Sequence, residues 1–116
     1  MTMRVLVYED NLLWSSRLKN ALTQLGHEAV VLPRPTISEG DCAIVNLGAD
    51  SIKALVPELR AQRIVVIAHA GHKEKDLMQL GKEAGCDILA TNSELTHKIA
   101  GLLERAQLLV DQKKEP

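Results

Sequence analysis

The sequence predicts an α/β protein with a doubly wound, five-stranded parallel sheet. Short apolar runs alternate along the chain with segments whose apolar residues recur at helical spacing, and strands that alternate with helices form parallel sheets covered on both faces. The chain has 116 residues, of which 46% are hydrophobic and 25% charged, which is enough for one core but not for two. We expect residues 1–110 to form a single domain and residues 111–116 a solvated C-terminal tail.

The first half of the chain predicts three strands and one complete helix. Arg4–Tyr8 is almost entirely apolar or β-branched, as in a strand that is buried on both faces. Residues 11–25 carry one stripe of apolar side chains at helical spacing, and Gly26 follows where the helix is expected to end. Residues 28–32 form the second strand, and Cys42–Asn46 forms the third.

The connection between the second and third strands is unusual for this fold. Pro33, Pro35, Ser38 and Gly40 interrupt a segment that is too short and too broken for a crossover helix. We therefore expect the second helix to be short or missing.

The middle of the chain predicts a helix, a strand and another helix. Asp50 is expected to cap the first of these helices, in which Pro57 removes a backbone hydrogen bond and predicts a kink or a late start. Residues 64–68 form the clearest buried strand. The next helix is expected to run from about residue 72 to residue 84.

The end of the chain predicts a short strand and a long helix. Gly85 is expected to end the preceding helix, and residues 87–90 form a weak fifth strand. Asn92 or Ser93 is expected to cap a last helix whose apolar stripe lies within residues 99–110.

Composition argues against nucleic acid and membrane as partners. Lys and Arg number 14 against 15 Asp and Glu, so the chain has no overall attraction to polyanions. One Trp, one Tyr and no Phe provide no platform for stacking bases. No run approaches the roughly 20 apolar residues that span a bilayer, and the start has no signal-peptide pattern. We expect a cytoplasmic protein.

Polar residues follow the predicted strands at the edge where ligands bind in open parallel sheets. Glu9 and Asp10 come directly after the first strand, and Asn46 ends the third. Two adjacent carboxylates repel each other, and such a pair is usually kept where Mg²⁺ or a fixed hydrogen-bond donor needs it. The alternative is that Glu9 or Asp10 simply caps the first helix.

At these positions the chain resembles the receiver domain of bacterial two-component response regulators. Residues 5–11, Val-Leu-Val-Tyr-Glu-Asp-Asn, resemble the family's opening strand and acidic pair. Residues 82–87, Lys-Glu-Ala-Gly-Cys-Asp, are similar to the segment that leads into its fifth strand. The resemblance covers nearly the whole chain and implies the flavodoxin-like receiver fold, with strand order 2-1-3-4-5.

The resemblance also implies that the phosphorylation pocket is degenerate. Receivers accept a phosphoryl group on an aspartate that ends strand three, with Mg²⁺ held by that aspartate and the acidic pair. Here Glu9 and Asp10 match the acidic pair, but Asn46 stands at the acceptor position. An amide has no anionic oxygen to attack phosphorus, so the family's chemistry is not expected.

Other positions of the family pattern are changed as well. The hydroxyl position falls on Ala68 or Ala70, the lysine position on Asn92 and the aromatic switch position on Leu89. The predicted degenerate pocket comprises Glu9, Asp10, Asn46, Ala68 and Asn92.

The charge of this pocket suggests what replaces the cation. An ordinary receiver pocket has three carboxylates and one ammonium, a sum of -2, and Glu9 and Asp10 with two neutral asparagines also sum to -2. Our hypothesis is that Asn46 or Asn92 donates a hydrogen bond to the acidic pair and locks the pocket in one state. No cofactor is expected, and weak binding of Mg²⁺ by Glu9 and Asp10 is the alternative.

Two histidines near the same edge invite a metal site. His69 and His72 are three residues apart, but two imidazoles rarely hold a transition metal without a third placed ligand. We expect both to be solvent-exposed.

These residues predict a pseudo-receiver that is not an enzyme, does not depend on phosphorylation and acts by contact with another protein or as a homodimer. Receivers signal through their fourth helix, fifth strand and fifth helix, here near residues 73–83, 88–90 and 95–105. The predicted partner-binding residues are Lys73, Leu89, Leu95, Leu102 and Arg105. The alternatives are a flavodoxin-like domain that binds a small molecule or metal, and a response regulator with unconventional phosphorylation.

Overall fold

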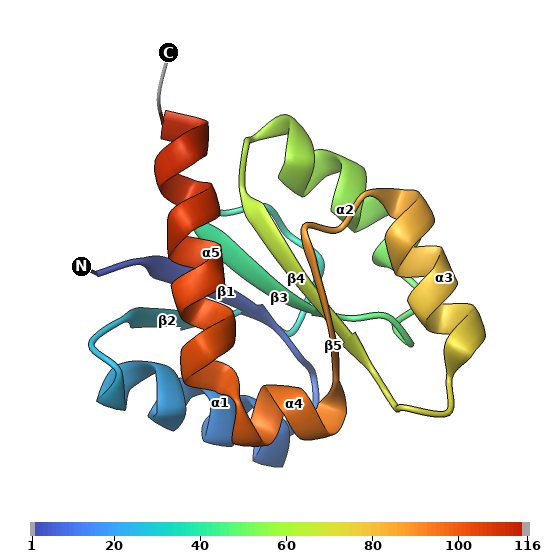
Figure 1. Ribbon diagram of the computed structural model, residues 1–116, viewed down its shortest axis with the longest axis horizontal. Helices are drawn as coiled ribbons and strands as arrows, with labels where there is room; N and C mark the ends of the chain where they lie inside the picture. Colours follow the sequence, from blue (N-terminus) through green and yellow to red (C-terminus); the bar gives the residue numbers. More distant parts are fainter. Residues whose placement is uncertain (1, 115–116) are drawn as a thin grey trace.

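The computed structural model describes residues 2–114 and places a parallel sheet between two layers of helices (Figure 1). The strands are β1 (Arg4–Tyr8), β2 (Glu28–Val31), β3 (Cys42–Asn46), β4 (Val65–Ala70) and β5 (Ile88–Thr91). They lie in the order β2-β1-β3-β4-β5, and every neighbouring pair is parallel. The predicted fold class and strand order are confirmed.

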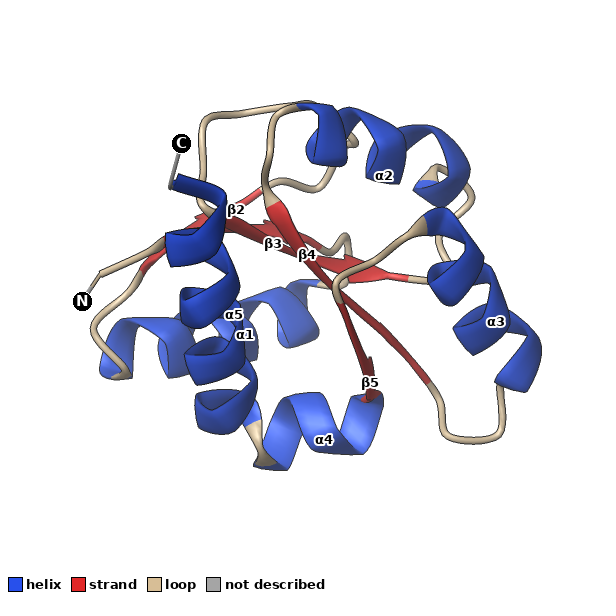
Figure 2. Ribbon diagram, turned by 45° about the horizontal axis from the view of Figure 1, so that its top comes forward, coloured by secondary structure: helices blue, strands red, loops and turns tan. Residues whose placement is uncertain are grey.

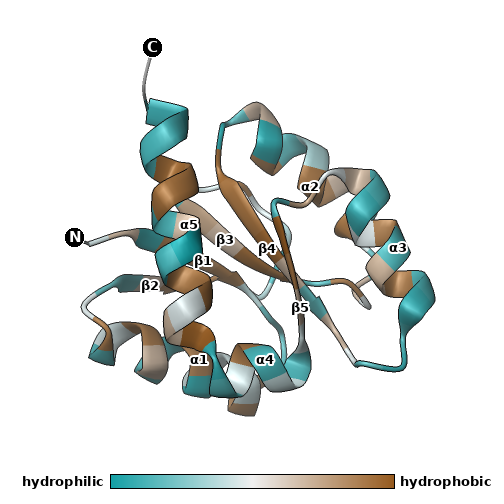
Figure 3. Cartoon of the chain, viewed as in Figure 1, coloured by the Kyte–Doolittle hydropathy of each residue, from teal (hydrophilic) through white to brown (hydrophobic). Residues whose placement is uncertain are grey.

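Helices cover both faces of the sheet. They are α1 (Leu12–Gln24), α2 (Ile52–Ala61), α3 (Lys75–Ala84), α4 (Asn92–His97) and α5 (Ile99–Lys114). The side chains of α1, α4 and α5 pack on one face and those of α2 and α3 on the other (Figure 2). Figure 3 shows apolar strands inside and mainly hydrophilic outer helix faces, as burial of apolar surface requires. Within residues 2–114, no helix is long and apolar enough to cross a membrane.

Residues 32–41 connect β2 to β3 without a helix, as predicted. The connection is held by Tyr8, whose Oη donates to the Thr36 carbonyl at 2.8 Å, and by Asp41, whose Oδ2 accepts from the Arg4 amide at 2.8 Å. Burial, together with the nearby Glu58 carboxylate, raises the pKa of Tyr8 to about 12. The phenol therefore keeps its proton and remains a donor.

Several predicted boundaries in the second half are wrong. Strand β4 continues to Ala70, two residues beyond the predicted end, and α3 begins only at Lys75. Ser51 stands at the N-cap position of α2, and its side chain makes no capping hydrogen bond. The predicted cap by Asp50 is therefore wrong. Helix α2 runs through Pro57 from Ile52 onward, without the late start.

The last predicted helix is divided in two, and its cap is neither Asn92 nor Ser93. Helix α4 ends at His97 and α5 begins at Ile99. Thr91 caps α4, because its Oγ1 accepts from the Glu94 amide at 3.0 Å and Glu94 Oε1 accepts from the Thr91 amide at 2.9 Å. This reciprocal pair is a capping box.

The first residues of the predicted solvated tail are part of a helix. Helix α5 continues to Lys114, so residues 111–114 are helical. Lys113 Nζ lies 3.5 Å from an Asp87 carboxylate oxygen, and Lys114 Nζ lies 3.5 Å from Asp41. Cationic side chains also stabilise the negative end of a helix dipole. Residues 115–116, the rest of the predicted tail, lie outside the described residues.

Gly40 is required where the connection between β2 and β3 crosses β1. A Cβ at this position would lie 2.8 Å from Leu6 Cγ, and Leu6 is fully buried. We predict that Gly40→Ala lowers the free energy of unfolding by about 1–3 kcal/mol, because Leu6 must leave its packed position. Urea denaturation at equilibrium measures this change.

The matched control is Gly101→Ala in α5, where no atom of residues 2–114 outside this helix's own backbone lies within 4 Å of an added Cβ. That substitution should stabilise the protein by about 0.5–1 kcal/mol, since alanine favours a helix. Equal effects of the two substitutions would contradict the proposed close approach at Gly40.

Candidate functional site

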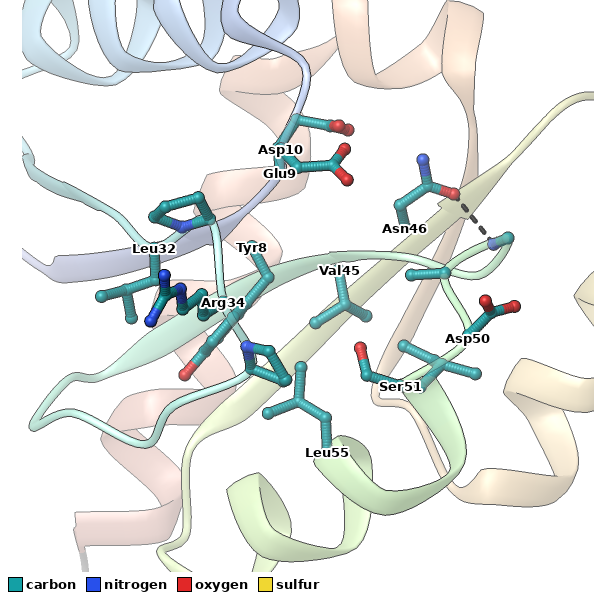
Figure 4. A pocket seen from close by; sticks show the side chains of 15 residues that line it. Tyr8, Glu9, Asp10, Leu32, Arg34, Val45, Asn46, Asp50, Ser51 and Leu55 are labelled. Atoms are coloured by element: carbon teal, nitrogen blue, oxygen red, sulfur yellow. Dashed lines mark hydrogen bonds between the residues drawn. The ribbon is translucent and has the colours of Figure 1, made fainter.

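A cavity of about 530 Å³ opens at the carboxyl edge of the sheet (Figure 4). It lies between the helix-free connection after β2 and the loop that leads from β3 into α2. Its lining residues are 8–10, 32–35, 45–46, 48–52 and 55. The structure thus brings Glu9, Asp10 and Asn46 together in one cavity, as predicted, whereas Ala68 and Asn92 do not line it.

The acidic pair does not cap the first helix. Asn11 caps α1, since its Oδ1 accepts from the Trp14 amide at 3.0 Å. Glu9 is only 8% exposed and its Oε2 accepts from the Asn11 amide at 3.1 Å, whereas Asp10 is exposed. Within residues 2–114, neither carboxylate forms an ion pair and Glu9 Oε1 has no hydrogen-bond partner. The capping alternative for Glu9 and Asp10 is therefore wrong.

Asn46 turns its oxygen away from the acidic pair. Its Oδ1 accepts a hydrogen bond from the Gly48 amide at 2.9 Å (Figure 4). The NH₂ group is left on the side of the cavity where Glu9 and Asp10 lie. An amide nitrogen has no lone pair to offer a cation or an electrophile, so Asn46 presents only donors there.

These groups do not fit the Mg²⁺ site of the receiver family. Magnesium binds oxygen ligands, and Asn46 offers N–H groups where the family has a third carboxylate. Among residues 2–114, no three His, Cys, Asp or Glu side chains come together as a candidate metal site. Weak binding of Mg²⁺ by Glu9 and Asp10 alone stays a prediction.

His69 occupies the strand end beside Asn46. The register pairs Asn46 with His69, and His69 with Ala90 on β5. Ala68 and Ala70 instead belong to the apolar cluster under α2 and α3. The residue next to the acceptor position is therefore His69, and the assignment of Ala68 to the pocket is wrong.

His69 is buried, contrary to the prediction of an exposed histidine. It is 2% exposed, and its ring stacks on Trp14 with centroids 5.9 Å apart. Its Nδ1 lies 2.7 Å from Asn92 Oδ1. The signal was present in the sequence, because a histidine between Ala68 and Ala70 at the end of an apolar run is compatible with a longer buried strand.

The hydrogen bonds of the two asparagines contradict the predicted lock. Asn46 accepts from the Gly48 amide and Asn92 bonds to His69. In the described part of the chain, neither donates a hydrogen bond to Glu9 or Asp10. Both asparagines therefore form their hydrogen bonds with groups other than the acidic pair.

The burial of His69 favours the neutral form of its ring. Burial lowers the pKa of His69, while the hydrogen bond with Asn92 and the charge of Glu9 act in the opposite direction and are smaller. Because Asn92 Oδ1 is the acceptor, the neutral ring carries its proton on Nδ1.

The predicted partner-binding residues do not all reach the surface. Lys73 and Arg105 are exposed, and Leu89 is partly buried. Leu95 and Leu102 are 1% and 5% exposed and belong to the core cluster under α1 and α5. Leu95 and Leu102 are therefore core residues, and their assignment as contact residues is wrong.

Comparison with solved structures defines the fold as that of response-regulator receiver domains, which confirms the fold implied by the resemblance. NtrX from Brucella abortus matches with a TM-score of 0.85 and 16% identity over 98% of this chain, which corresponds to only 29% of NtrX. The receiver domain of the Francisella response regulator 1452 matches with a TM-score of 0.74 and 20% identity over 97% of this chain and 99% of that domain.

A third match is the receiver domain of a signal transduction histidine kinase from Syntrophus aciditrophicus, with a TM-score of 0.78 and 18% identity. It covers 98% of this chain and 94% of that domain. No protein-family profile and no curated protein sequence matches this chain.

The lowered pKa of His69 predicts a loss of stability in mild acid. Below the ordinary histidine pKa of about 6.5, the unfolded chain binds a proton that folded His69 does not yet bind. The free energy of unfolding should therefore decrease as the pH falls from about 6.5 through the lowered folded pKa. Urea midpoints at about pH 7.5 and about pH 5.5 measure the decrease, which should be smaller in His69→Gln.

Burial also lowers the pKa of His27, so part of the pH dependence should persist in His69→Gln. Exposed His72 provides the control, and His72→Gln should keep the wild-type pH dependence. A wild-type pH dependence in His69→Gln would contradict the assignment.

Proposed function

We propose that this chain is a phosphorylation-independent receiver-fold module of a two-component-type regulatory system. It acts in the cytoplasm, as a single domain that includes the whole of α5, by binding another protein or a second copy of itself, and it is not an enzyme. The observation that carries the proposal is Asn46 at the end of β3, with its oxygen bonded to the Gly48 amide. Phosphoryl transfer needs an anionic nucleophile and a bound cation, and Asn46 supplies neither the nucleophile nor a ligand for the cation.

The packing of α3 over β5 supports a surface that is held in one conformation. A Cβ at Gly81 of α3 would lie 2.7 Å from Leu89 Cδ2 and 3.0 Å from Leu47 Cδ2. Leu89 stands where the family has its aromatic switch, and Leu47 directly follows Asn46. Close-packed side chains leave little room for a rotamer change, so Leu89 is a poor switch.

The proposed contact surface consists of the exposed parts of α3, β5 and α5 and the turn before α3. Lys73 lies in that turn and Arg105 on α5, and both are exposed. Charged residues at the rim of an interface steer association and select partners. In this proposal the partner is recognised through charge at Lys73 and Arg105 together with the partly buried Leu89.

The first test is incubation of the purified chain with Mg²⁺ and a small phosphodonor such as acetyl phosphate, followed by intact-mass measurement. We predict no phosphate adduct on the wild-type chain, whereas a receiver domain with its aspartate gains one under the same conditions. Asn46→Asp restores the acceptor carboxylate and is measured in parallel. A phosphate adduct on the unmodified chain, stable or labile, would contradict the proposal.

The second test is affinity capture of partners from the native cell with the wild-type chain and charge-reversed variants. Lys73→Glu and Arg105→Glu should each reduce capture of the partner severalfold, because they reverse exposed charges at the proposed surface. Lys19→Glu is the matched control, since Lys19 is exposed on α1 outside that surface. Sedimentation velocity of the same variants tests self-association, and equal behaviour of all three variants in both experiments would contradict the surface.

A further inference from the structure

The cavity at the carboxyl edge has the size of a small-molecule site. Its volume of about 530 Å³ lies within the range of roughly 300–1,000 Å³ that ligand pockets occupy. The cavity exists because residues 32–41 contain no helix, and the extended segment that replaces it forms one wall. Apart from residues 8–10, the lining residues come from that wall and from the segment that runs from the end of β3 into α2 (Figure 4).

The charge of the cavity selects a cation. Glu9, Asp10 and Asp50 line it against a single basic residue, Arg34. Glu9 is only 8% exposed, and its Oε1 has no hydrogen-bond partner among residues 2–114. This oxygen is not among the buried polar atoms that lack a partner, so it is open to the cavity, where a bound positive group can pair with it.

The apolar walls of the cavity favour an organic ligand over a bare metal ion. Val45, Ile52 and Leu55 are buried residues that line the cavity below the acidic pair. Ser51 lies beside them, and its hydroxyl makes no cap hydrogen bond to α2. A compact hydrated dication gains nothing from aliphatic walls, whereas a short hydrocarbon chain does.

We propose that this cavity binds a small organic cation, with its ammonium or guanidinium group at Glu9 and Asp10 and a short apolar body against Val45, Ile52 and Leu55. A planar guanidinium can form two parallel hydrogen bonds with one carboxylate, which suits the unpaired oxygen of Glu9. This site goes beyond the proposed function, because it provides ligand binding at the place where receivers are phosphorylated.

The experiment titrates the isotope-labelled full chain with methyl-, ethyl- and butylguanidinium and follows backbone amide signals by NMR. Saturable shifts are expected at Glu9, Asp10, Gly48 and Ser51. Affinity should increase by up to about fourfold for each buried methylene, the equivalent of about 0.8 kcal/mol. Butylurea has nearly the same shape without the charge, and it should bind much more weakly, as should butyrate.

Variants locate the charge contact. Asp10→Asn should weaken butylguanidinium binding about twofold to fivefold, and because Asp10 is exposed this change is compatible with folding. Glu9→Gln should weaken it further, because Glu9 is buried. Asp76→Asn removes the same charge from the exposed start of α3, outside the cavity, and should leave the affinity unchanged.

Four results would overturn the proposal. The first two are equal binding of butylurea and butylguanidinium, and the same loss of affinity in Asp76→Asn as in Asp10→Asn. The third is a set of NMR shifts confined to residues outside the cavity. The fourth is shifts at Glu9 and Asp10 with Mg²⁺ but with none of the guanidinium compounds. The phosphodonor experiment is independent of each of these results, so either proposal can fail without the other.

Discussion

The hydrogen bond between His69 and Asn92 joins the end of β4 to the start of α4, directly after β5, at the edge where the site lies. His69 is almost fully buried and stacks on Trp14, so one imidazole connects β4 with α1 and with the start of α4. A buried ring nitrogen needs a partner, and Asn92 supplies one without adding charge. If His69 were charged, its burial would be costly, and the contact between α1 and the sheet would weaken.

This arrangement explains why the edge can fold without a cation between its carboxylates. Repulsion between Glu9 and Asp10 is limited because Asp10 is exposed and its charge is screened by solvent, while Glu9 accepts a hydrogen bond from the Asn11 amide. The asparagines are occupied by the Gly48 amide and by His69. The negative charge of the edge is thus left available to a ligand, and the uncovered cavity beside it gives such a ligand an apolar wall.

Local patterns in the sequence predicted most of the fold. The apolar runs located all five strands, and the prolines before Gly40 predicted the missing helix because proline and glycine disfavour helices through local geometry alone. The resemblance to receivers predicted that Glu9, Asp10 and Asn46 meet at one edge. The cap of α4 was predicted wrongly as Asn92 or Ser93, although Thr91 and Glu94 have the spacing of a capping box.

The remaining errors come from contacts that no short segment determines. A two-residue extension of β4 changes which side chain lies beside Asn46, and only pairing with β3 and β5 sets that end. Leu95 and Leu102 look like surface residues of a signalling face, but α4 and α5 turn them into the core. The partner of Asn92 is His69, 23 residues earlier in the chain, and local sequence carries no trace of this pairing.

The arrangement of this edge depends on a neutral His69 that is bonded through Nδ1 to Asn92. Long-range ¹H–¹⁵N NMR of the imidazole at about neutral pH tests it most directly, because the two ring nitrogens report the tautomer and the charge. We expect a neutral ring with its proton on Nδ1. A charged imidazolium, or a neutral ring protonated on Nε2, would contradict it.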